Sequence, residues 1–294
     1  MVATVRYTSS DEDSARWARF VFREGDVVVS TRSKSGTTWV QQVVASLLHG
    51  TPDLPAPLAT LSPWVDWLVE PVDEVVARLE AQPGRRVVKT HTPLDGLPRD
   101  PRATSVVVCR HPLDAAVSLY HQGGNLDRAR MRELTGDTSP VREPRPRPPL
   151  HDWLAGWAEE VRDPRAAMDS LDGFLHHARV AWARRDDADT VLVHYADLLA
   201  DREGEMRRLA ERLGIEVEPS AWPALVDAAS FDAMRSRAGE TAPDPSGVLL
   251  DQRAFFRRGT SGAGSEVLTA DELVRYRARS AAALPSALDA WLHR

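Results

Sequence analysis

Four short runs rich in β-branched residues constrain the fold of this chain more than any other feature of its sequence. The runs are Asp26–Ser30, Arg86–Lys89, Thr104–Cys109 and Thr190–His194. Each run is mostly apolar at successive positions, so a strand formed from it needs both of its faces covered. Such runs are typical of the buried parallel strands at the centre of an α/β sheet.

Helical patterns follow three of these runs, at residues 38–49, 113–121 and 196–213. The alternation predicts βαβ units with right-handed crossovers. We therefore expect a single α/β domain over residues 1–294, with a central parallel sheet flanked by helices. In such sheets, ligands bind in loops beyond the carboxyl ends of the strands. Polar clusters follow all four runs there, at residues 32–38, 89–92 and 110–118 and at Tyr195.

The composition indicates a soluble globular protein. Hydrophobic residues make up 43% and charged residues 27% of the chain, and the formal net charge of -6 argues against broad nucleic-acid binding. The single cysteine, Cys109, excludes an internal disulfide, which suits a reducing compartment. The N-terminus has no signal-peptide pattern and the longest apolar runs are strand-sized. We therefore predict a cytoplasmic protein without a transmembrane segment.

Residues 138–150 are rich in proline and arginine and cannot form a regular helix or a central strand. A surface loop or lid and a disordered linker are equally favoured for this segment. The basic run Arg142–Arg147 fits a solvated surface better than a site that steers an anionic partner.

The segment DVVVS-TRSKSGTTW combines a strand, a tight turn and a helix start. Helix N-termini expose unpaired N–H groups and a positive dipole end. Gly36 allows an anion to approach the backbone closely, Lys34 adds a positive charge, and the hydroxyls of Thr37 and Thr38 add donors. The segment is not a Walker A loop, because Lys34 precedes the glycine. The alternative is an ordinary strand–turn–helix with a surface lysine.

Four segments resemble, in order, the motifs of cytosolic-type sulfotransferases that use 3′-phosphoadenosine-5′-phosphosulfate (PAPS). They are SKSGTTW at residues 33–39, KTHTP at 89–93, CRHPLDAAVSLYH at 109–121 and FFRRG at 255–259. VHYADL and ASFDAM match more weakly. SPWVDW, THTPLDGL and DAMRSRAGE further resemble bacterial glycolipid-type sulfotransferases. The resemblance implies a P-loop-like fold and transfer of a sulfuryl group from PAPS to an acceptor hydroxyl, with release of the nucleotide product PAP.

The resemblance also implies roles for single residues. Lys34 would contact the leaving phosphate, Lys89 would steady the sulfuryl group, and His91 would be the general base. The residues implied to bind the donor are Ser35, Gly36, Thr37, Thr38, Trp39, Arg110, Ser118, Tyr195, Ser230, Phe231, Met234, Arg257, Arg258 and Gly259. Arg110, Ser118 and the Arg257–Gly259 segment would hold the 3′-phosphate, while Trp39 and Phe231 would stack on adenine. No metal is required.

The chain departs from the family pattern in one loop, and the roles of two tryptophans are open. After Gly259, Ala263 and Gly264 replace an acidic residue and a tryptophan, which predicts a more mobile loop. Trp64 and Trp67 fit an acceptor pocket and ordinary core packing equally well. His111, His121 and His194 compete with His91 by position alone. The acceptor is predicted to be a phenol, a sugar or a lipid-linked hydroxyl.

Two other functions remain open from the residues alone. A P-loop phosphotransferase would need a magnesium site, often an Asp at the end of an apolar strand, but the strand through Cys109 ends in Arg110. A non-catalytic nucleotide-binding module on the same fold is the second. The presence of both Lys34 and His91 argues against it.

Overall fold

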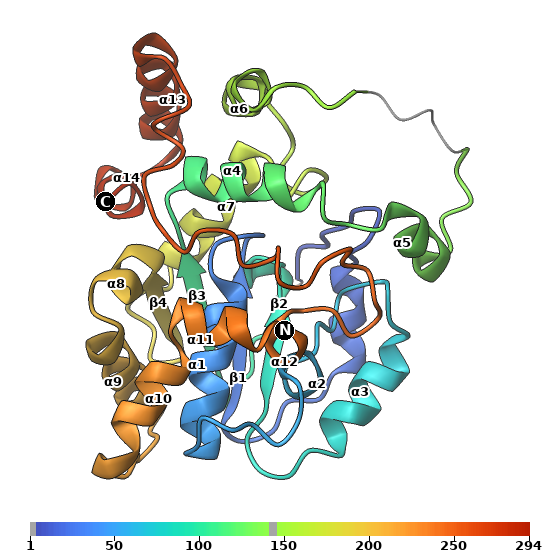
Figure 1. Cartoon of the computed structure of the whole chain (residues 1–294), viewed down its shortest axis with the longest axis vertical. Helices are drawn as coiled ribbons and strands as arrows, with labels where there is room; N and C mark the ends of the chain where they lie inside the picture. Colours follow the sequence, from blue (N-terminus) through green and yellow to red (C-terminus); the bar gives the residue numbers. More distant parts are fainter. Residues whose placement is uncertain (1–3, 141–145) are drawn as a thin grey trace.

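The predicted strands pair into one sheet in the computed structural model, which describes residues 4–140 and 146–294. The strands are β1 (Asp26–Thr31), β2 (Val87–Thr90), β3 (Ala103–Cys109) and β4 (Thr190–His194). They are all parallel, in the order β2-β1-β3-β4 (Figure 1). The predicted α/β fold with a central parallel sheet is confirmed, and its strand boundaries were correct to within one residue.

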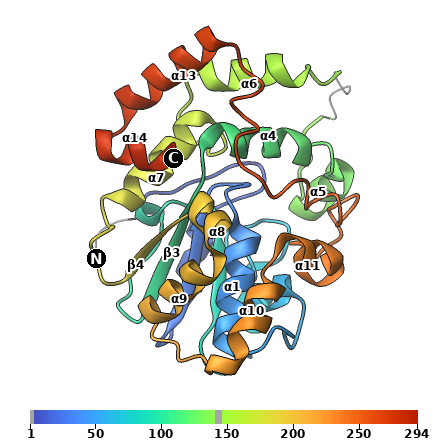
Figure 2. The same cartoon turned by 60° about the vertical axis from the view of Figure 1, so that its left-hand side comes forward.

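Helices cover both faces of the sheet because neighbouring residues of each strand point to opposite sides. Val27 and Val29 of β1 pack on one side, while Val28 packs on the other. The first side is covered by α1 (Thr37–His49), α8 (Tyr195–Ala200), α9 (Arg202–Arg212) and α10 (Trp222–Ala228) (Figure 2). The second side is covered by η1 (Ser14–Arg19), α3 (Val72–Glu80), α4 (Pro112–Gln122), α6 (Leu150–Glu159), α7 (Leu171–Trp182), α13 (Ala270–Ala283) and α14 (Ser286–Leu292).

Shorter elements lie at the two ends of the sheet or in the connections. They are α2 (Leu58–Leu61), α5 (Arg128–Thr135), α11 (Phe231–Ser236), α12 (Ala238–Thr241), η2 (Leu94–Gly96) and η3 (Pro219–Ala221). The longest helix in the described part of the chain, α13, has 14 residues. None of the helices described is both long and apolar enough to cross a membrane.

The single helix predicted over residues 196–213 is wrong, because the structure divides it into α8 and α9. Asp201 leaves the helical conformation with φ of -141° and ends α8. Its carboxylate then accepts a hydrogen bond from the Gly204 N–H at 2.8 Å and caps α9. Aspartate is a favoured N-cap residue, a signal that the apolar periodicity of this region concealed.

The Pro/Arg-rich segment at 138–150 is only partly described. Residues 141–145, including the start of the predicted basic run at Arg142, lie outside the described residues. Its described residues before Leu150 form no helix or strand, whereas Leu150 itself begins α6. Arg147 packs its guanidinium over the Tyr120 ring and donates to the Tyr120 carbonyl, and the Tyr120 hydroxyl donates to the Pro148 carbonyl at 2.8 Å. These contacts attach the end of the segment to α4.

Candidate active site

The loop between β1 and α1 has an unusual backbone, with two residues in the left-handed region. Lys34 has φ of 63° and is the one non-glycine residue with positive φ in the described chain, while Gly36 has φ of 107°. A Cβ atom on Gly36 would lie 3.0 Å from Cδ2 of Tyr195, so a side chain is disfavoured there by both conformation and space. Successive N–H groups in such a turn, followed directly by a helix N-terminus, form a cradle for an anion.

Lys34 projects from this loop into a buried cavity. Its Nζ lies 3.3 Å from Oε1 of Gln122 and 3.7 Å from the centre of the Phe255 ring. Burial, together with the charges of Arg110, Lys89 and Arg257, lowers the pKa of Lys34 to about 7. An anion would stabilise such a group of neighbouring cations.

Arg110, at the carboxyl end of β3, connects three segments around the loop. Its guanidinium donates to the carbonyls of Lys34 at 3.2 Å and Thr260 at 2.7 Å, and it lies over the Tyr195 ring at 4.2 Å. Asp114 does not pair with Arg110. Arg110 therefore connects these segments, and its Nε has no hydrogen-bond partner among the described residues and can donate to a ligand.

Asp114 instead fixes the loop that follows Gly259. Its two carboxylate oxygens accept hydrogen bonds from the N–H groups of Gly262 and Gly264, each at 2.8 Å. Gly264 also packs so close to α4 that a Cβ atom on it would lie 2.4 Å from Cβ of Leu113. This anchoring argues against the mobility that the glycine-rich sequence predicted.

The segment after β2 presents two sets of side chains in opposite directions. Lys89 and His91 face Trp64, with Lys89 Nζ 3.9 Å from the Trp64 ring and the His91 ring 4.5 Å from it, centre to centre. Thr90 and Thr92 instead donate to Oδ2 of the buried Asp66. The two-residue period of an extended strand therefore brings the predicted sulfuryl-binding lysine and the predicted base to one side.

His91 is held in one orientation by its backbone neighbours. Its Nδ1 lies 2.7 Å from the Thr31 carbonyl, which can only accept a hydrogen bond, so Nδ1 carries the proton and Nε2 is left with its lone pair. The buried Arg32 donates to the His91 carbonyl and forms an ion pair with Asp169 at 2.7 Å. Burial, followed by the charges of Lys89 and Arg32, holds the pKa of His91 well below its usual value. A neutral imidazole with free Nε2 can accept a proton at neutral pH.

An aromatic platform lies on the far side of the loop from His91. The Trp39 indole donates to the Ala229 carbonyl at 2.7 Å, and its ring lies 5.2 Å from that of Tyr195 at 70°. Phe231 packs against Gly259, where a Cβ atom would lie 2.5 Å from its Cδ2. Both Trp39 and Phe231 contact the small cluster around Met234, so the two rings are held by the same core.

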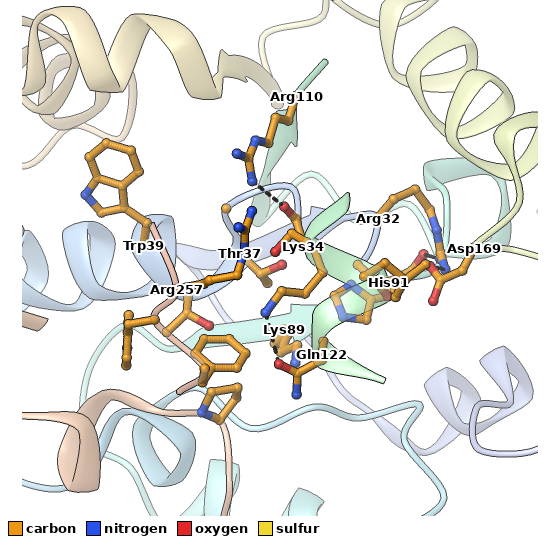
Figure 3. A pocket seen from close by; sticks show the side chains of 18 of the residues that line it. Arg32, Lys34, Thr37, Trp39, Lys89, His91, Arg110, Gln122, Asp169 and Arg257 are labelled. Atoms are coloured by element: carbon orange, nitrogen blue, oxygen red, sulfur yellow. Dashed lines mark hydrogen bonds and ion pairs between the residues drawn. The ribbon is translucent and has the colours of Figure 1, made fainter. Parts of the chain in front are cut away.

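One cavity of about 460 Å³ brings most of the predicted residues together (Figure 3). Those that line it are Lys34, Gly36, Thr37, Thr38, Trp39, Trp64, Trp67, Lys89, His91, Arg110, Ser118, Tyr195, Phe231, Met234, Arg257, Arg258 and Gly259. Two predicted residues do not line it. Ser35 is buried behind the loop, and the hydroxyl of Ser230 caps α11 by accepting from the Ala233 N–H. The rival histidines His111, His121 and His194 are also absent from its wall.

Several residues in the cavity wall were not predicted from the sequence. Gln122 lies four residues after Ser118 on α4, a spacing that indicates a shared helix face. Phe255 belongs to the FFRRG motif, and Arg32 directly follows β1. Glu12 and Asp169 come from segments that carry no motif, so only the structure identifies them.

The aromatic pair Trp64 and Trp67 lies next to His91, with ring centres 5.0 Å apart and planes at 12°. Asp66, which lies between the two tryptophans in the sequence, is buried against the two threonines of the β2 segment. Glu70 pairs with Arg78 at 2.9 Å. Within the described ranges, no group of three or more His, Cys, Asp or Glu side chains is arranged to hold a metal ion.

Comparison with known proteins assigns the chain to a family. A family model described as "Sulfotransferase domain" matches residues 24–279. Two relatives from Mycobacterium bovis and Mycobacterium tuberculosis, each named glycolipid sulfotransferase, are 40% identical over 100% of this chain and 95% of their own length. Human sulfotransferase 1C2 is 24% identical over 83% of this chain and 77% of its own length.

Solved structures share the fold. Retinol dehydratase, solved with retinol and PAP, superposes with a TM-score of 0.69 at 21% identity, over 93% of this chain and 85% of its own. A mouse sulfotransferase solved with PAP superposes with a TM-score of 0.67 at 21% identity, over 95% of this chain and 90% of its own. The family match and the full-length relatives favour sulfuryl transfer over the phosphotransferase and the non-catalytic module. The chain belongs to the sulfotransferase family, and the predicted enzyme class is confirmed.

Proposed function

We propose that this sulfotransferase moves a sulfuryl group from PAPS to a hydroxyl of a glycolipid or a similar small amphiphilic acceptor, and releases PAP. The donor is supported by the PAP in the two structural neighbours and by the cation cluster of the cavity. The acceptor class is supported by the names of the full-length mycobacterial relatives.

The donor's two phosphates have separate partners in the proposal. The backbone of the Lys34–Gly36 turn and the Thr37 and Thr38 hydroxyls bind the 5′-phosphate, at the N-terminus of α1. Arg110, Ser118 and the Arg257–Gly259 segment bind the 3′-phosphate, and Trp39 and Phe231 hold the adenine. Because the guanidinium Nε atoms of Arg110 and Arg257 are buried and without hydrogen-bond partners among the described residues, these side chains have capacity left for phosphate oxygens.

The observation that carries the mechanism is the hydrogen bond from Nδ1 of His91 to the Thr31 carbonyl, because it leaves Nε2 as the proton acceptor. As Nε2 takes the proton of the acceptor hydroxyl, the hydroxyl oxygen bonds to sulfur. The bond between sulfur and the bridging oxygen breaks, and the 5′-phosphate leaves with the electron pair. The Lys34 ammonium stabilises the charge that develops on the leaving phosphate, and Lys89 contacts the sulfuryl oxygens.

The cavity wall suits an acceptor with an apolar part and a polar part. Leu126, Met131, Val248 and Leu249 contribute an apolar wall on the α5 side. Ser9, Asp11 and Asp169 contribute polar groups elsewhere in the same cavity. A lipid or aglycone would be favoured by the first set and a hydroxyl-bearing headgroup by the second.

The first experiment is a thermal-unfolding titration with PAP in the absence of metal, beside ATP with magnesium. A ligand at about a hundred times its dissociation constant stabilises the folded state by about 2.7 kcal/mol. We expect a shift with PAP alone, followed by turnover of labelled PAPS with an amphiphilic alcohol. A shift with ATP and magnesium but none with PAP would contradict the assigned donor.

A further inference from the structure

The cavity wall contains a buried carboxylate, Glu12, that no step of the proposed mechanism uses. Glu12 is only 5% exposed, and its Oε2 atom has no hydrogen-bond partner within residues 4–140 and 146–294. Its backbone is fixed, because Glu12 forms an antiparallel bridge with Trp67 and the Leu68 N–H donates to the Asp11 carbonyl at 2.8 Å. A side chain that is held in a cavity wall and has an unpaired acceptor atom is typical of a ligand-binding residue.

Burial of the Glu12 side chain carries a cost for the fold. Buried polar atoms are almost always hydrogen-bonded, because an unpaired one loses its hydration without compensation. Burial raises the pKa of Glu12 well above its ordinary value, against the smaller opposing effect of Arg32. An apolar side chain of similar size would therefore fill this position at lower cost in folding free energy.

Glu12 also lies close to the reaction centre. Its negative charge acts to raise the pKa of Lys89, so the two side chains interact electrostatically across the cavity. The backbone bridge to Trp67 places Glu12 beside the Trp64–Trp67 stack, and Trp64 contacts the His91 ring. An acceptor bound here would present one of its groups to His91 and another to Glu12.

The charges around Glu12 select for an uncharged ligand. Acidic Asp11 lies in the same part of the wall and would repel an anion, whereas Lys89 and Arg32 would repel a cation. Asp169 is already paired with Arg32. A neutral group with several hydroxyls satisfies these conditions, since hydroxyls donate well to carboxylates. Its C–H surfaces also fit beside indole rings.

We propose that Glu12 and the Trp64–Trp67 stack form the subsite for an uncharged sugar ring of the acceptor, with Glu12 accepting hydrogen bonds from hydroxyls next to the one that is sulfated. This inference rests on the proposed function, since it defines the acceptor class of the same cavity. It assigns Glu12 as a specificity-determining residue, separate from the base His91.

The test compares two acceptors and four proteins, namely the wild type, two Glu12 variants and one control variant. Octyl glucoside carries neighbouring hydroxyls, whereas 2-naphthol carries a single one. For Glu12→Gln and Glu12→Leu we expect kcat/KM with octyl glucoside to fall by about 10- to 100-fold, mostly through KM and more for Leu than for Gln. The kcat/KM with 2-naphthol and the affinity for PAP should stay within about twofold. Glu74→Gln, an exposed carboxylate on α3, is the matched control.

Thermal unfolding separates this role from a structural one. If Glu12 held the fold together, both variants would unfold at lower temperature. If Glu12 instead binds the ligand, both variants should be as stable as the wild type or more stable, because they remove an unpaired buried carboxylate. Since the folded pKa lies above the unfolded one, the carboxylate destabilises the fold above about pH 4.5 and the gain should grow as pH rises through the folded pKa.

The outcomes distinguish this inference from the proposed function. Equal losses with both acceptors would overturn the sugar subsite and make Glu12 a group that acts on Lys89 or His91. Turnover of 2-naphthol by the wild-type protein, without turnover of octyl glucoside, would also overturn it while leaving sulfuryl transfer intact. Loss of turnover with both acceptors in the wild type would count against the proposed function. Calorimetric binding of octyl glucoside to the PAP complex, and its loss in Glu12→Leu, would still decide the subsite.

Discussion

Within the described chain, the donor part and the acceptor part of the cavity leave different polar groups without hydrogen-bond partners, guanidinium N–H groups in the first and a carboxyl oxygen in the second. The donor part gathers Lys34 and Arg110 on loops that directly follow β1 and β3, and Arg257 on the connection between α12 and α13. The acceptor part instead contains the unpaired Glu12, which comes from the N-terminal segment. In both, the protein leaves groups unpaired that a ligand can pair. The difference between unpaired donors and an unpaired acceptor atom indicates that an anionic nucleotide and a hydrogen-donating acceptor occupy the two parts.

The two parts also differ in how firmly the sequence determines them. Lys34 and Arg110 of the donor part belong to strand–loop–helix units, and Asp114 ties the Gly262–Gly264 loop to α4. The acceptor part brings together segments far apart in the chain, as where Glu12 and Asp11 make backbone contacts with Trp67 and Leu68. Variants that affect one part and spare the other test whether this division is functional.

The largest effect is expected at His91, where the two parts meet. For His91→Ala we expect kcat to fall by about 10²- to 10⁴-fold, because no base is left to take the proton of the substrate hydroxyl. Affinities for PAP and octyl glucoside, measured by calorimetry, should change by less than about threefold. His49→Ala, at the exposed end of α1, controls for loss of any imidazole. A matching loss of PAP affinity would assign His91 to the donor part instead.

The next effect is expected within the donor part, at Lys34. For Lys34→Met we expect kcat to fall by about 10²- to 10³-fold, since charge on the leaving phosphate is no longer neutralised. PAP binding should weaken less, because the backbone cradle and the arginines remain. Comparison of kcat from steady-state turnover with Kd from calorimetry checks this. Unchanged turnover would exclude the role at the leaving phosphate.

Lys34 also predicts a pH dependence of the donor part. With a pKa of about 7 in the free protein, its amine is mostly uncharged above pH 7, and a bound phosphate would raise that pKa. The affinity for PAP should therefore fall as pH rises from 7 to 9, and binding should take up protons. Lys34→Met should flatten this slope, leaving a smaller one from Lys89, whose pKa is about 8. A slope unchanged in Lys34→Met would contradict the assignment.

The smallest effect is expected at Asp114, which touches neither ligand in the proposal. Asp114→Ala leaves the N–H groups of Gly262 and Gly264 unbonded, so the Kd for PAP should rise by about tenfold, while the affinity for octyl glucoside is retained. Asp201→Ala, which removes a similar carboxylate–backbone contact at the α9 cap, should lower stability without changing either affinity. If Asp114→Ala lowered the affinities for PAP and octyl glucoside equally, the two parts would not be independent.

The sequence predicted the sheet and most of the donor wall because both depend on short-range patterns. Runs of β-branched residues define strands, and a glycine after Lys34 defines the turn. It failed where a competing local signal mattered, as at the Asp201 cap that divides the helix predicted over 196–213. A local contact also occupies Ser230, whose hydroxyl caps α11 and which does not line the cavity. The role of Glu12 depends on the packing of distant segments, which no spacing along the chain records.

The pairing of β1 with β2 has a consequence for natural variation of this protein. Thr31 follows the register pair Ser30 and Thr90, so the carbonyl that orients the imidazole and the histidine itself are fixed by one ladder of hydrogen bonds. Insertion or deletion of a single residue in β2 would exchange the faces of Lys89 and His91 with those of the threonines that bind Asp66. Homologous enzymes should therefore keep the length of this segment constant, even where their loops between helices differ in length.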